Sequence, residues 1–423
     1  MVLKSVSASY ESTKERGEFT DKEEPTMIER TMSSKRYIES NPYSSLQCED
    51  LSDIEKTCAR NIKCWIERLA NPCSDLVTSL QAGHEDEGQG LQYLARENFR
   101  TNDGRKCVRE VFYRGGKRHG FYREMFEDGG MRMVGRYSEG QKVGTHWCWC
   151  IGDGYLIGEV DDDDKVHGDH TVYLYPDITT CILASFMHGN MKVGKLGRLC
   201  AIYEEFRILI PEVDIVEPSV SYSYSPSTSI IITSCPLLRD PYEQRYVFVK
   251  ESQTPGAGEG LWAKAKILKD QVFAFYNGQK VRQLHADMKT LVMSDYAIKL
   301  SDTMDLDIKY EDSLLTNYCA TLVHKTCHSF TPNSKFTQSW HPRFGLIMAL
   351  TAKQDIEAGQ EVFVNYNYKL PFSPVWYQQQ FFTHLRQNLQ WTETKIQEWT
   401  SSKARMAGVP INIPPIQTTD NKD

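Results

Sequence analysis

Two stretches of this chain decide its fold: HKTCHSFTPN at residues 324–333 and VNYNY at residues 364–368. Earlier in the chain, a glycine-rich loop, PGAGEG, occupies residues 255–260, and FYNG occupies residues 275–278. Three glycines in five residues let a backbone approach a ligand closely, and an acidic side chain can meet an amine. Each motif alone is weak, but their order is specific, and it is completed by GQEV at 359–362 and by Trp376.

The composition is that of an ordinary globular protein. The chain has 423 residues, enough for two or three domains, of which 40% are hydrophobic and 25% charged. No apolar run approaches the roughly 20 residues that span a bilayer, and no secretory pattern opens the sequence. We therefore expect an intracellular protein, nuclear and/or cytoplasmic and not secreted. The net charge of −7 argues against direct nucleic-acid binding and is compatible with a basic peptide partner.

Neither the cysteines nor the acidic residues predict a metal site. The twelve cysteines form none of the Cys-x-x-Cys pairs that zinc sites use, so we expect reduced, mostly buried thiols. The acidic run from Asp161 to Asp164 lacks the glycine and the glutamate of a calcium loop. A solvated turn is expected there instead.

Residues 88–213 carry an internal repeat. Gly120, Gly144 and Gly168 lie 24 residues apart, and the segments between them alternate in polarity as strands do. Turn dipeptides recur once per unit, at Asp128-Gly129, Asp153-Gly154 and Pro176-Asp177. This period predicts stacked hairpins in one long sheet, in which glycine allows positive φ at tight turns. Units such as residues 135–144 resemble MORN repeats, and an unrelated meander with glycine turns is the alternative.

The motifs in this order resemble the SET domain of the MORN-repeat histone lysine methyltransferases, the SET domain-containing protein seven type. Three further segments are similar to that type: Asp240-Pro241-Tyr242, His341-Pro342-Arg343-Phe344-Gly345 and Gly158-Glu159-Val160. The resemblance implies a mainly β, multidomain protein, in which a MORN-repeat β-hairpin array precedes a SET domain of β-clip-like fold with a C-terminal helix. In this family the two signature segments cross and together hold S-adenosylmethionine and the target lysine.

Shifts in composition divide the chain into seven segments. The N-terminal head is rich in Ser, Thr, Lys and Glu and lacks periodicity. Helical spacing follows at Ile54, Cys58, Ile62, Trp65, Ile66 and Leu69. A later helix is predicted with one face formed by Trp376, Phe381, Leu385 and Leu389. The expected segments are a disordered region (1–48), a short helical segment (49–87), the array (88–213), a linker (214–235), the SET domain (236–372), a helical segment that closes the site (373–398) and a flexible tail (399–423).

The resemblance implies transfer of a methyl group from S-adenosylmethionine to a lysine of a protein or peptide, a histone tail or a non-histone protein. The reaction is an in-line displacement, so the protein mainly positions and desolvates the reactants. A lysine, with a pKa of about 10.4, must first lose its proton, and an apolar, aromatic channel favours the neutral amine. The array is expected to brace its neighbour or to contact a protein or lipid. No transmembrane segment is expected.

The same resemblance assigns site residues by their place in the motifs. The catalytic channel that holds the lysine is formed by Tyr276, Tyr366, Tyr368 and Phe336. The cofactor is held by Ala257, Gly258, Glu259, Cys327, His328, Trp376 and Gln380. The substrate peptide pairs, through backbone hydrogen bonds, with Tyr296, Ala297, Ile298 and Lys299. His328 is not expected to act as a general base, and no metal is expected to take part.

Three positions depart from the family pattern. Cys327 replaces an asparagine, and because a thiol is only a weak donor, a cofactor hydrogen bond is lost or weakened. Such a loss costs roughly 1.5–3 kcal/mol, or about ten- to a hundredfold in affinity. Phe336 replaces a tyrosine, which in the family shifts the preference from one methyl group towards two. Gln380 replaces a glutamate.

Two hypotheses of different classes follow. The first is an active protein-lysine N-methyltransferase. The second is a catalytically impaired SET-fold binding or scaffold protein that acts through its MORN repeats. The sequence leaves open the substrate protein and its lysine, mono- versus dimethylation, the effect of Cys327 on cofactor binding, the oligomeric state, and nucleus versus cytoplasm.

Overall fold

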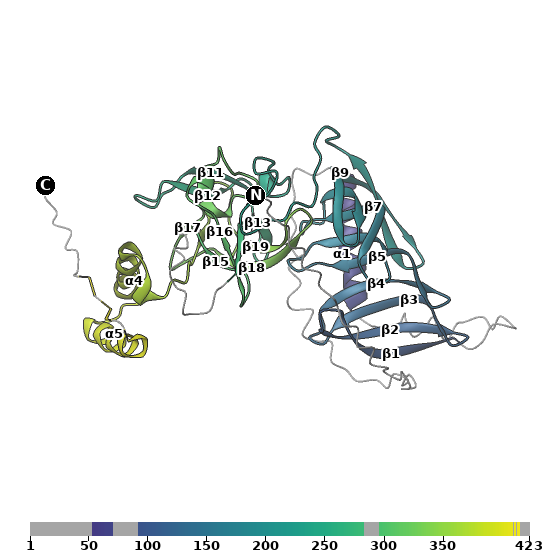
Figure 1. Ribbon diagram of the computed structural model, residues 1–423, viewed down its shortest axis with the longest axis horizontal. Coiled ribbons are helices and arrows are strands. Elements are labelled where there is room, and N and C mark those ends of the chain that lie inside the picture. The colour runs from purple at the N-terminus through teal and green to yellow at the C-terminus, as the bar shows by residue number, and fades with distance from the viewer. Residues whose placement is uncertain (1–52, 71–91, 283–295, 409, 412, 415–423) are drawn as a thin grey trace, which may run out of the picture.

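The computed structural model is mainly β, which confirms the predicted fold class (Figure 1). It describes residues 53–70, 92–282, 296–408, 410, 411, 413 and 414. Five predicted segments fall wholly or partly outside the described residues. They are the disordered region 1–48, both ends of the first helical segment (49–52 and 71–87), the start of the array (88–91), part of the SET domain (283–295) and part of the tail (409, 412 and 415–423). None of the described helices is long and apolar enough to cross a membrane.

A single antiparallel sheet of ten strands forms the N-terminal part, and each strand pairs with the next along the chain. The strands are β1 (Gln92–Arg100), β2 (Lys106–Arg114), β3 (Lys117–Phe126), β4 (Met131–Ser138), β5 (Gln141–Trp149), β6 (Tyr155–Val160), β7 (Val166–Leu174), β8 (Thr180–Met187), β9 (Asn190–Glu205) and β10 (Ile208–Ile215). The three predicted turn dipeptides fall between β3 and β4, β5 and β6, and β7 and β8. Consecutive hairpins are therefore present, whereas their identity as MORN repeats stays a prediction.

The glycines of the repeat lie within strands, so our placement of them in tight turns was wrong. Gly120, Gly144 and Gly168 belong to β3, β5 and β7 and have φ of 84°, 69° and 113°. The ladder shifts its register beside each of them, which is the pattern of a β-bulge with a left-handed glycine. Gly135 is required for another reason, because an added Cβ would overlap the ring of His146. The spacing of these glycines therefore reflects one β-bulge in each hairpin unit.

Helix α1 (Asp53–Ala70) packs against the sheet. The ring of Trp65 lies 4.9 Å from that of Trp147 in β5, and its Nε1 donates to the carbonyl of Arg207 at 3.0 Å. Most of the predicted apolar face is buried, namely Cys58, Ile62, Trp65 and Leu69. Ile54 is 58% exposed and does not belong to that face.

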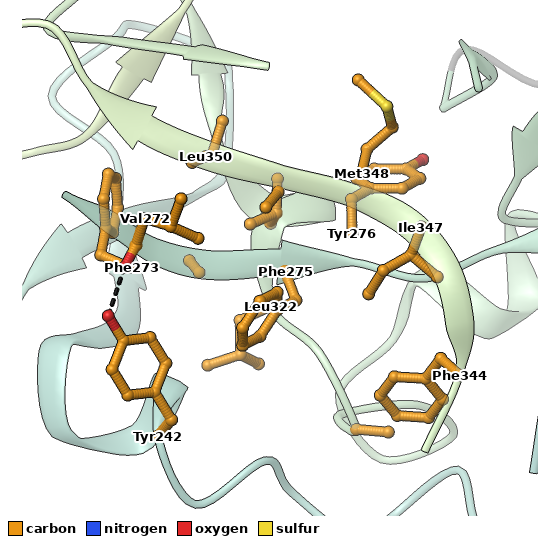
Figure 2. Close-up of a cluster of buried hydrophobic side chains, with 14 of the residues drawn as sticks. Tyr242, Val272, Phe273, Phe275, Tyr276, Leu322, Phe344, Ile347, Met348 and Leu350 are labelled. Atoms are coloured by element: carbon orange, nitrogen blue, oxygen red, sulfur yellow. Dashed lines mark hydrogen bonds between the residues drawn. The ribbon is translucent and has the colours of Figure 1, made fainter. Parts of the chain in front are cut away.

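The C-terminal part consists of small sheets around one apolar core. Two sheets have two strands each: β11 (Val247–Glu251) with β12 (Glu259–Ala263), and β17 (Cys327–His328) with β20 (Phe363–Val364). Two sheets have three strands each, in the order β13 (Val272–Tyr276), β19 (Gly345–Ala352), β18 (Ser334–His341) and in the order β14 (Gln279–Arg282), β16 (Met304–Asp307), β15 (Ile298–Lys299). Figure 2 shows side chains of β13 and β19 packed together, with the Tyr242 hydroxyl donating to the Val272 carbonyl. This core holds β13, which carries Tyr276, in place.

The predicted linker, residues 214–235, is exposed at most positions and anchored at a few. Within it, Tyr222 is buried and forms an antiparallel bridge with β9. Just beyond it, Asp240 joins the two parts of the molecule. Its Oδ2 accepts a hydrogen bond at 2.7 Å from the hydroxyl of Tyr175, which lies between β7 and β8, and the same oxygen lies 2.9 Å from His341 Nε2. All three of these side chains are buried. The array therefore braces the C-terminal part through a buried polar contact.

Two helices end the described chain, α4 (Val375–Gln387) and α5 (Glu393–Ala407), and they lie at the end of the molecule remote from the large sheet (Figure 1). The tail predicted from residue 399 is wrong for residues 399–407, which are helical. The predicted face of α4 is right only at Leu385: the other buried residues are Tyr377 and Phe382, whereas Trp376 and Leu389 are exposed. Aromatic residues occur on adjacent positions of this helix, so periodicity could not select the buried side.

Candidate active site

The two signature segments lie side by side. β17 and β20 pair in parallel, and Ser329 N donates to the Val364 carbonyl at 3.0 Å. The side chain of Asn333 links the same segments, since its Nδ2 donates to the Glu361 carbonyl and its Oδ1 accepts from Phe363 N, both at 2.8 Å. Residues that are far apart in sequence are thus held within hydrogen-bonding distance, which places the remaining candidate residues around one centre.

The glycine-rich loop connects β11 to β12 and is anchored by Glu361. Ser252 N donates to the Gly258 carbonyl at 2.8 Å, which closes the loop. The buried carboxylate of Glu361 accepts from Ser252 Oγ at 2.5 Å and from Gln253 N at 2.8 Å. Gly256 and Gly258 have positive φ, and an added Cβ at either would meet nothing within 4 Å. The motif around Glu361 in the sequence does not by itself indicate this anchoring role.

Glu259, at the start of β12, forms an ion pair that was not predicted. Its Oε2 lies 2.6 Å from Nζ of Lys325, whose side chain is only 8% exposed, while that of Glu259 is 49% exposed. A buried ammonium group requires a partner, so this pair neutralises Lys325. The half-exposed carboxylate remains accessible to a second cationic group.

Cys327 lies beside the glycine-rich loop. Its thiol contacts Ser252 Oγ at 3.3 Å and the Glu259 carbonyl at 3.6 Å. Burial raises the pKa of this thiol, so it stays protonated at neutral pH. One thiol proton replaces the two donors and one acceptor that an amide would offer at this position.

His328 carries a buried nitrogen that has no hydrogen-bond partner among the described residues. Burial lowers the pKa of His328 to about 4, so the ring is neutral at physiological pH. Its Nδ1 accepts from Tyr366 N at 3.2 Å, which assigns the ring proton to Nε2. That Nε2 is the unsatisfied atom, and the buried Thr326 Oγ1 and Trp262 Nε1 are unsatisfied too. Buried donors of this kind are rare unless a ligand or water completes them.

The predicted channel residues are arranged around two phenol groups. The Tyr276 hydroxyl donates to the Tyr296 carbonyl, and the Tyr366 hydroxyl donates to the Thr326 carbonyl at 2.7 Å. Burial raises the pKa of Tyr276 well above its ordinary value, and the neighbouring Tyr366 is among the further causes. The ring of Phe336 packs edge-on against Tyr276 with centroids 6.3 Å apart. The Tyr276 phenol therefore stays protonated, and its oxygen keeps the capacity to accept.

An aromatic wall continues from these residues to α4. Tyr368 lies 5.4 Å from Tyr366 between ring centroids, and the two lie 6.4 and 6.3 Å from Trp376. The indole of Trp376, at 40% exposure, has surface available for stacking. Gln380 follows one turn later and is half-buried. Tyr377 was not predicted as a site residue, yet it is buried 4.7 Å from the ring of His328.

The predicted substrate strand lies at the edge of its sheet. β15 pairs with β16 and is the outer strand of the three. Leu300 N donates to the Met304 carbonyl, so the alternation of an antiparallel ladder turns the backbone groups of Lys299 away from β16. Ile298 and its neighbours Tyr296 and Ala297 are half-buried, and the Lys299 side chain is exposed. An edge of this kind can accept another extended strand.

The structure thus brings together residues from distant parts of the chain. The predicted residues form two groups. The first contains the loop residues Ala257, Gly258 and Glu259 together with Cys327, His328, Tyr366, Tyr368 and Trp376. The second contains Tyr276, Phe336 and Tyr296. Phe330 and Tyr377 belong to the aromatic wall and were missed, because a single aromatic residue gives no signal that separates a site from a core.

Comparison with known protein families gives two matches. Residues 137–207 match the family described as histone H3 K4-specific methyltransferase SET7 N-terminal, and residues 258–367 match the SET domain. The second range contains the first signature segment, all but the last residue of the second, and most of the candidate residues.

Among curated proteins, the chain is similar to histone-lysine N-methyltransferase SETD7 of Halocynthia roretzi, with 35% identity over 243 residues. This alignment covers 57% of the chain and 63% of that relative, which is less than two thirds of its length. Two solved structures are more distant. "ctPRC2 in an autoinhibited conformation bound to S-adenosylmethionine" is 21% identical with a TM-score of 0.23, covering 29% of this chain and 15% of that one. "Crystal structure of an active polycomb repressive complex 2 in the stimulated state" is 20% identical with a TM-score of 0.23, covering 30% and 16%.

Proposed function

We propose that this chain, which matches the SET domain over residues 258–367 and the SET7 N-terminal family over residues 137–207, is an S-adenosylmethionine-dependent protein-lysine N-methyltransferase. The substrate is a lysine in a histone tail or in another protein. The observation that carries the proposal is the pairing of the two signature segments around an unsatisfied donor, His328 Nε2, near the phenol groups of Tyr366 and Tyr276.

The residues present fit the cofactor. The half-exposed carboxylate of Glu259 suits its amine, His328 Nε2 is a buried donor without an acceptor, and the exposed indole of Trp376 suits a flat purine. Ala257 and Gly258 lie in the loop that would surround the methionine end, and Gln380 lies on α4 after Trp376. When bound, S-adenosylmethionine supplies a methyl group on a positively charged sulfur.

The phenols hold and orient the lysine amine. Each hydroxyl of Tyr276 and Tyr366 already donates to a backbone carbonyl, so its oxygen is directed to accept from an amine N–H. Tyr368 completes the apolar lining, in which the neutral amine is favoured over the ammonium ion. The ring of Phe336 leaves the space of one hydroxyl beside Tyr276, and this space favours a second methyl group.

The substrate peptide adds a strand to β15. The backbone groups of Lys299 and Ala297 lie on the side that faces away from β16, and they would pair with the peptide on either side of its lysine. The basic side chains of a histone-type peptide are compatible with the acidic balance of the chain, −7. We place the protein in the nucleus and/or the cytoplasm, where such substrates occur.

The test joins a binding measurement to a product measurement. Full-length protein is titrated with S-adenosylmethionine in a calorimeter, and an array of lysine-containing peptides is then incubated with both and analysed by mass. Saturable binding together with added mass in multiples of one methyl group is expected. Absence of cofactor binding would falsify the proposal, and it would favour the second candidate.

The second candidate is a SET-fold binding or scaffold protein with impaired catalysis. It is favoured by one observation, that the Cys327 thiol is already engaged with Ser252 and Glu259 and offers no amide to the cofactor. In that case the hairpin array, as MORN repeats, would provide the contact with a protein or lipid partner.

A further inference from the structure

Three potential metal ligands meet on the hairpin array, outside the candidate active site. Asp161 follows β6, His167 lies in β7, and His188 lies in the turn between β8 and β9. One ligand atom from each of the three lies within 4.8 Å of the others. They are separated by 6 and 21 residues in the sequence, so no short sequence motif predicts that they lie together.

The carboxylate of Asp161 is already oriented towards the two histidines. Its Oδ1 accepts from the backbone N–H groups of Asp163 and Lys165, both at 3.0 Å. Its Oδ2 lies 2.7 Å from Nδ1 of His188, and the ring centroids of His167 and His188 are 5.2 Å apart. These hydrogen bonds hold the carboxylate in place with one oxygen facing His188.

We propose that Asp161, His167 and His188 form a binding site for a divalent cation of the zinc type. Two imidazoles and one carboxylate are a ligand set that zinc accepts, with a water in the fourth position. At bond lengths of about 2.0–2.1 Å, tetrahedral ligands lie about 3.3 Å apart. The observed separations need only small side-chain rotations to reach this value, and both histidine side chains are exposed and able to rotate.

The surrounding charges also favour a cation. Asp162, Asp163 and Asp169 are exposed near the ligands, whereas Lys165 is the one basic residue of the β6–β7 turn. The remaining acid of the turn, Asp164, is engaged with Lys142 and Arg132 and does not take part.

A bound ion would join two neighbouring turns of the sheet, the one between β6 and β7 and the one between β8 and β9. His188 has a φ of 50°, an uncommon value for a residue other than glycine, and a metal bond would hold it there. The bound ion would therefore stabilise the array by linking these two turns, and this role is independent of the proposed methyl transfer.

The test compares three variants of the full-length chain by zinc calorimetry at neutral pH, with a reductant that contains no thiol. His167→Ala removes a ligand, and His188→Asn removes another while asparagine tolerates the left-handed backbone. His170→Ala is the control, because His170 is exposed in the same strand but lies outside the ligand set. We expect the first two variants to lose roughly tenfold or more in zinc affinity, and the control to match the parent.

Cobalt spectra provide a second readout, because the free cysteines could also bind metal. Ligation by nitrogen and oxygen gives only weak visible bands, whereas thiolate ligation adds an intense band in the near ultraviolet. Equal zinc affinities in all variants, or a thiolate band in the parent protein, would overturn the proposal.

Discussion

The hairpin array and the candidate active site both bury polar groups, but they treat them differently. In the array, the fully buried carboxylate of Glu124 is surrounded by Arg109 at 2.9 Å, Lys142 at 3.4 Å and Arg132. At the site, the buried Nε2 of His328 has no partner among the described residues. The array satisfies its buried charge internally, whereas the site keeps a donor available. Since His146 Nε2 in the array is also buried without a described partner, the position of the His328 donor beside Tyr366 is what indicates a ligand site.

The largest effect is expected from the array. Glu124→Gln removes the buried charge that Arg109, Arg132 and Lys142 share, although these cations keep Glu97 and Asp164 as partners. The free energy of unfolding should fall by about 3 kcal/mol, the lower end of the usual cost of breaking a buried ion pair. Chemical denaturation followed by tryptophan fluorescence measures this. Glu127→Gln, which removes an exposed partner of Lys106, is the control and should change stability by less than about 1 kcal/mol. Similar losses in both variants would contradict the comparison.

Acid should act on the array through His146. Burial lowers its pKa to about 4, whereas an unfolded histidine titrates at about 6.5. Between these values the unfolded state binds more protons, so stability is lost as the pH falls from about 6.5 to about 4, by up to about 3 kcal/mol from this residue. Denaturation curves at several pH values should show a shallower acid dependence in His146→Gln. An unchanged dependence would show that His146 titrates normally.

The next largest effect is expected on kcat, from a substitution in the candidate active site. Tyr366→Phe removes the hydroxyl that orients the amine, which should lower kcat by about a hundredfold while cofactor affinity stays nearly unchanged. Steady-state kinetics and calorimetry separate the two quantities. Tyr310→Phe, at an exposed position, is the control. Equal turnover in both variants would remove Tyr366 from the reaction.

A smaller effect is expected from Cys327→Asn, on the affinity of the candidate site for the cofactor. The amide restores donors that the thiol lacks, so the affinity for S-adenosylmethionine should rise about tenfold. Calorimetric titration measures it, with Cys235→Ser as a control in the segment before Asp240. Unchanged affinity would mean that other groups already satisfy the cofactor.

The smallest effect concerns the product. Phe336→Tyr fills the space beside Tyr276 and should shift the products from dimethyl towards monomethyl lysine, with little change in the first methyl transfer. Mass analysis of the peptide product at full conversion reports this shift. If the parent protein produces only monomethyl lysine, the space at Phe336 is not what limits the product.

The sequence was a good guide wherever the signal was local. The turn dipeptides, the repeat of Gly120, Gly144 and Gly168, and the two signature segments each combine a few neighbouring residues with a fixed chemical demand. The glycines were found for the right reason, positive φ, but were placed in turns, because a period does not distinguish a turn from a bulge. On α4 the buried side was missed, because Trp376, Tyr377, Phe381 and Phe382 are equally apolar to a periodicity argument.

By itself the sequence determined the order of the hairpins and the SET-type motifs, and it supplied the residues proposed for the reaction, since local spacing and side-chain chemistry are sufficient for these. Only the tertiary structure decided that Lys325 pairs with Glu259, that Glu361 anchors the glycine-rich loop, and that Asp161 meets two histidines. Each of these contacts joins residues brought close by strand pairing and core packing. Their distances are set by the whole fold, and no sequence interval records them.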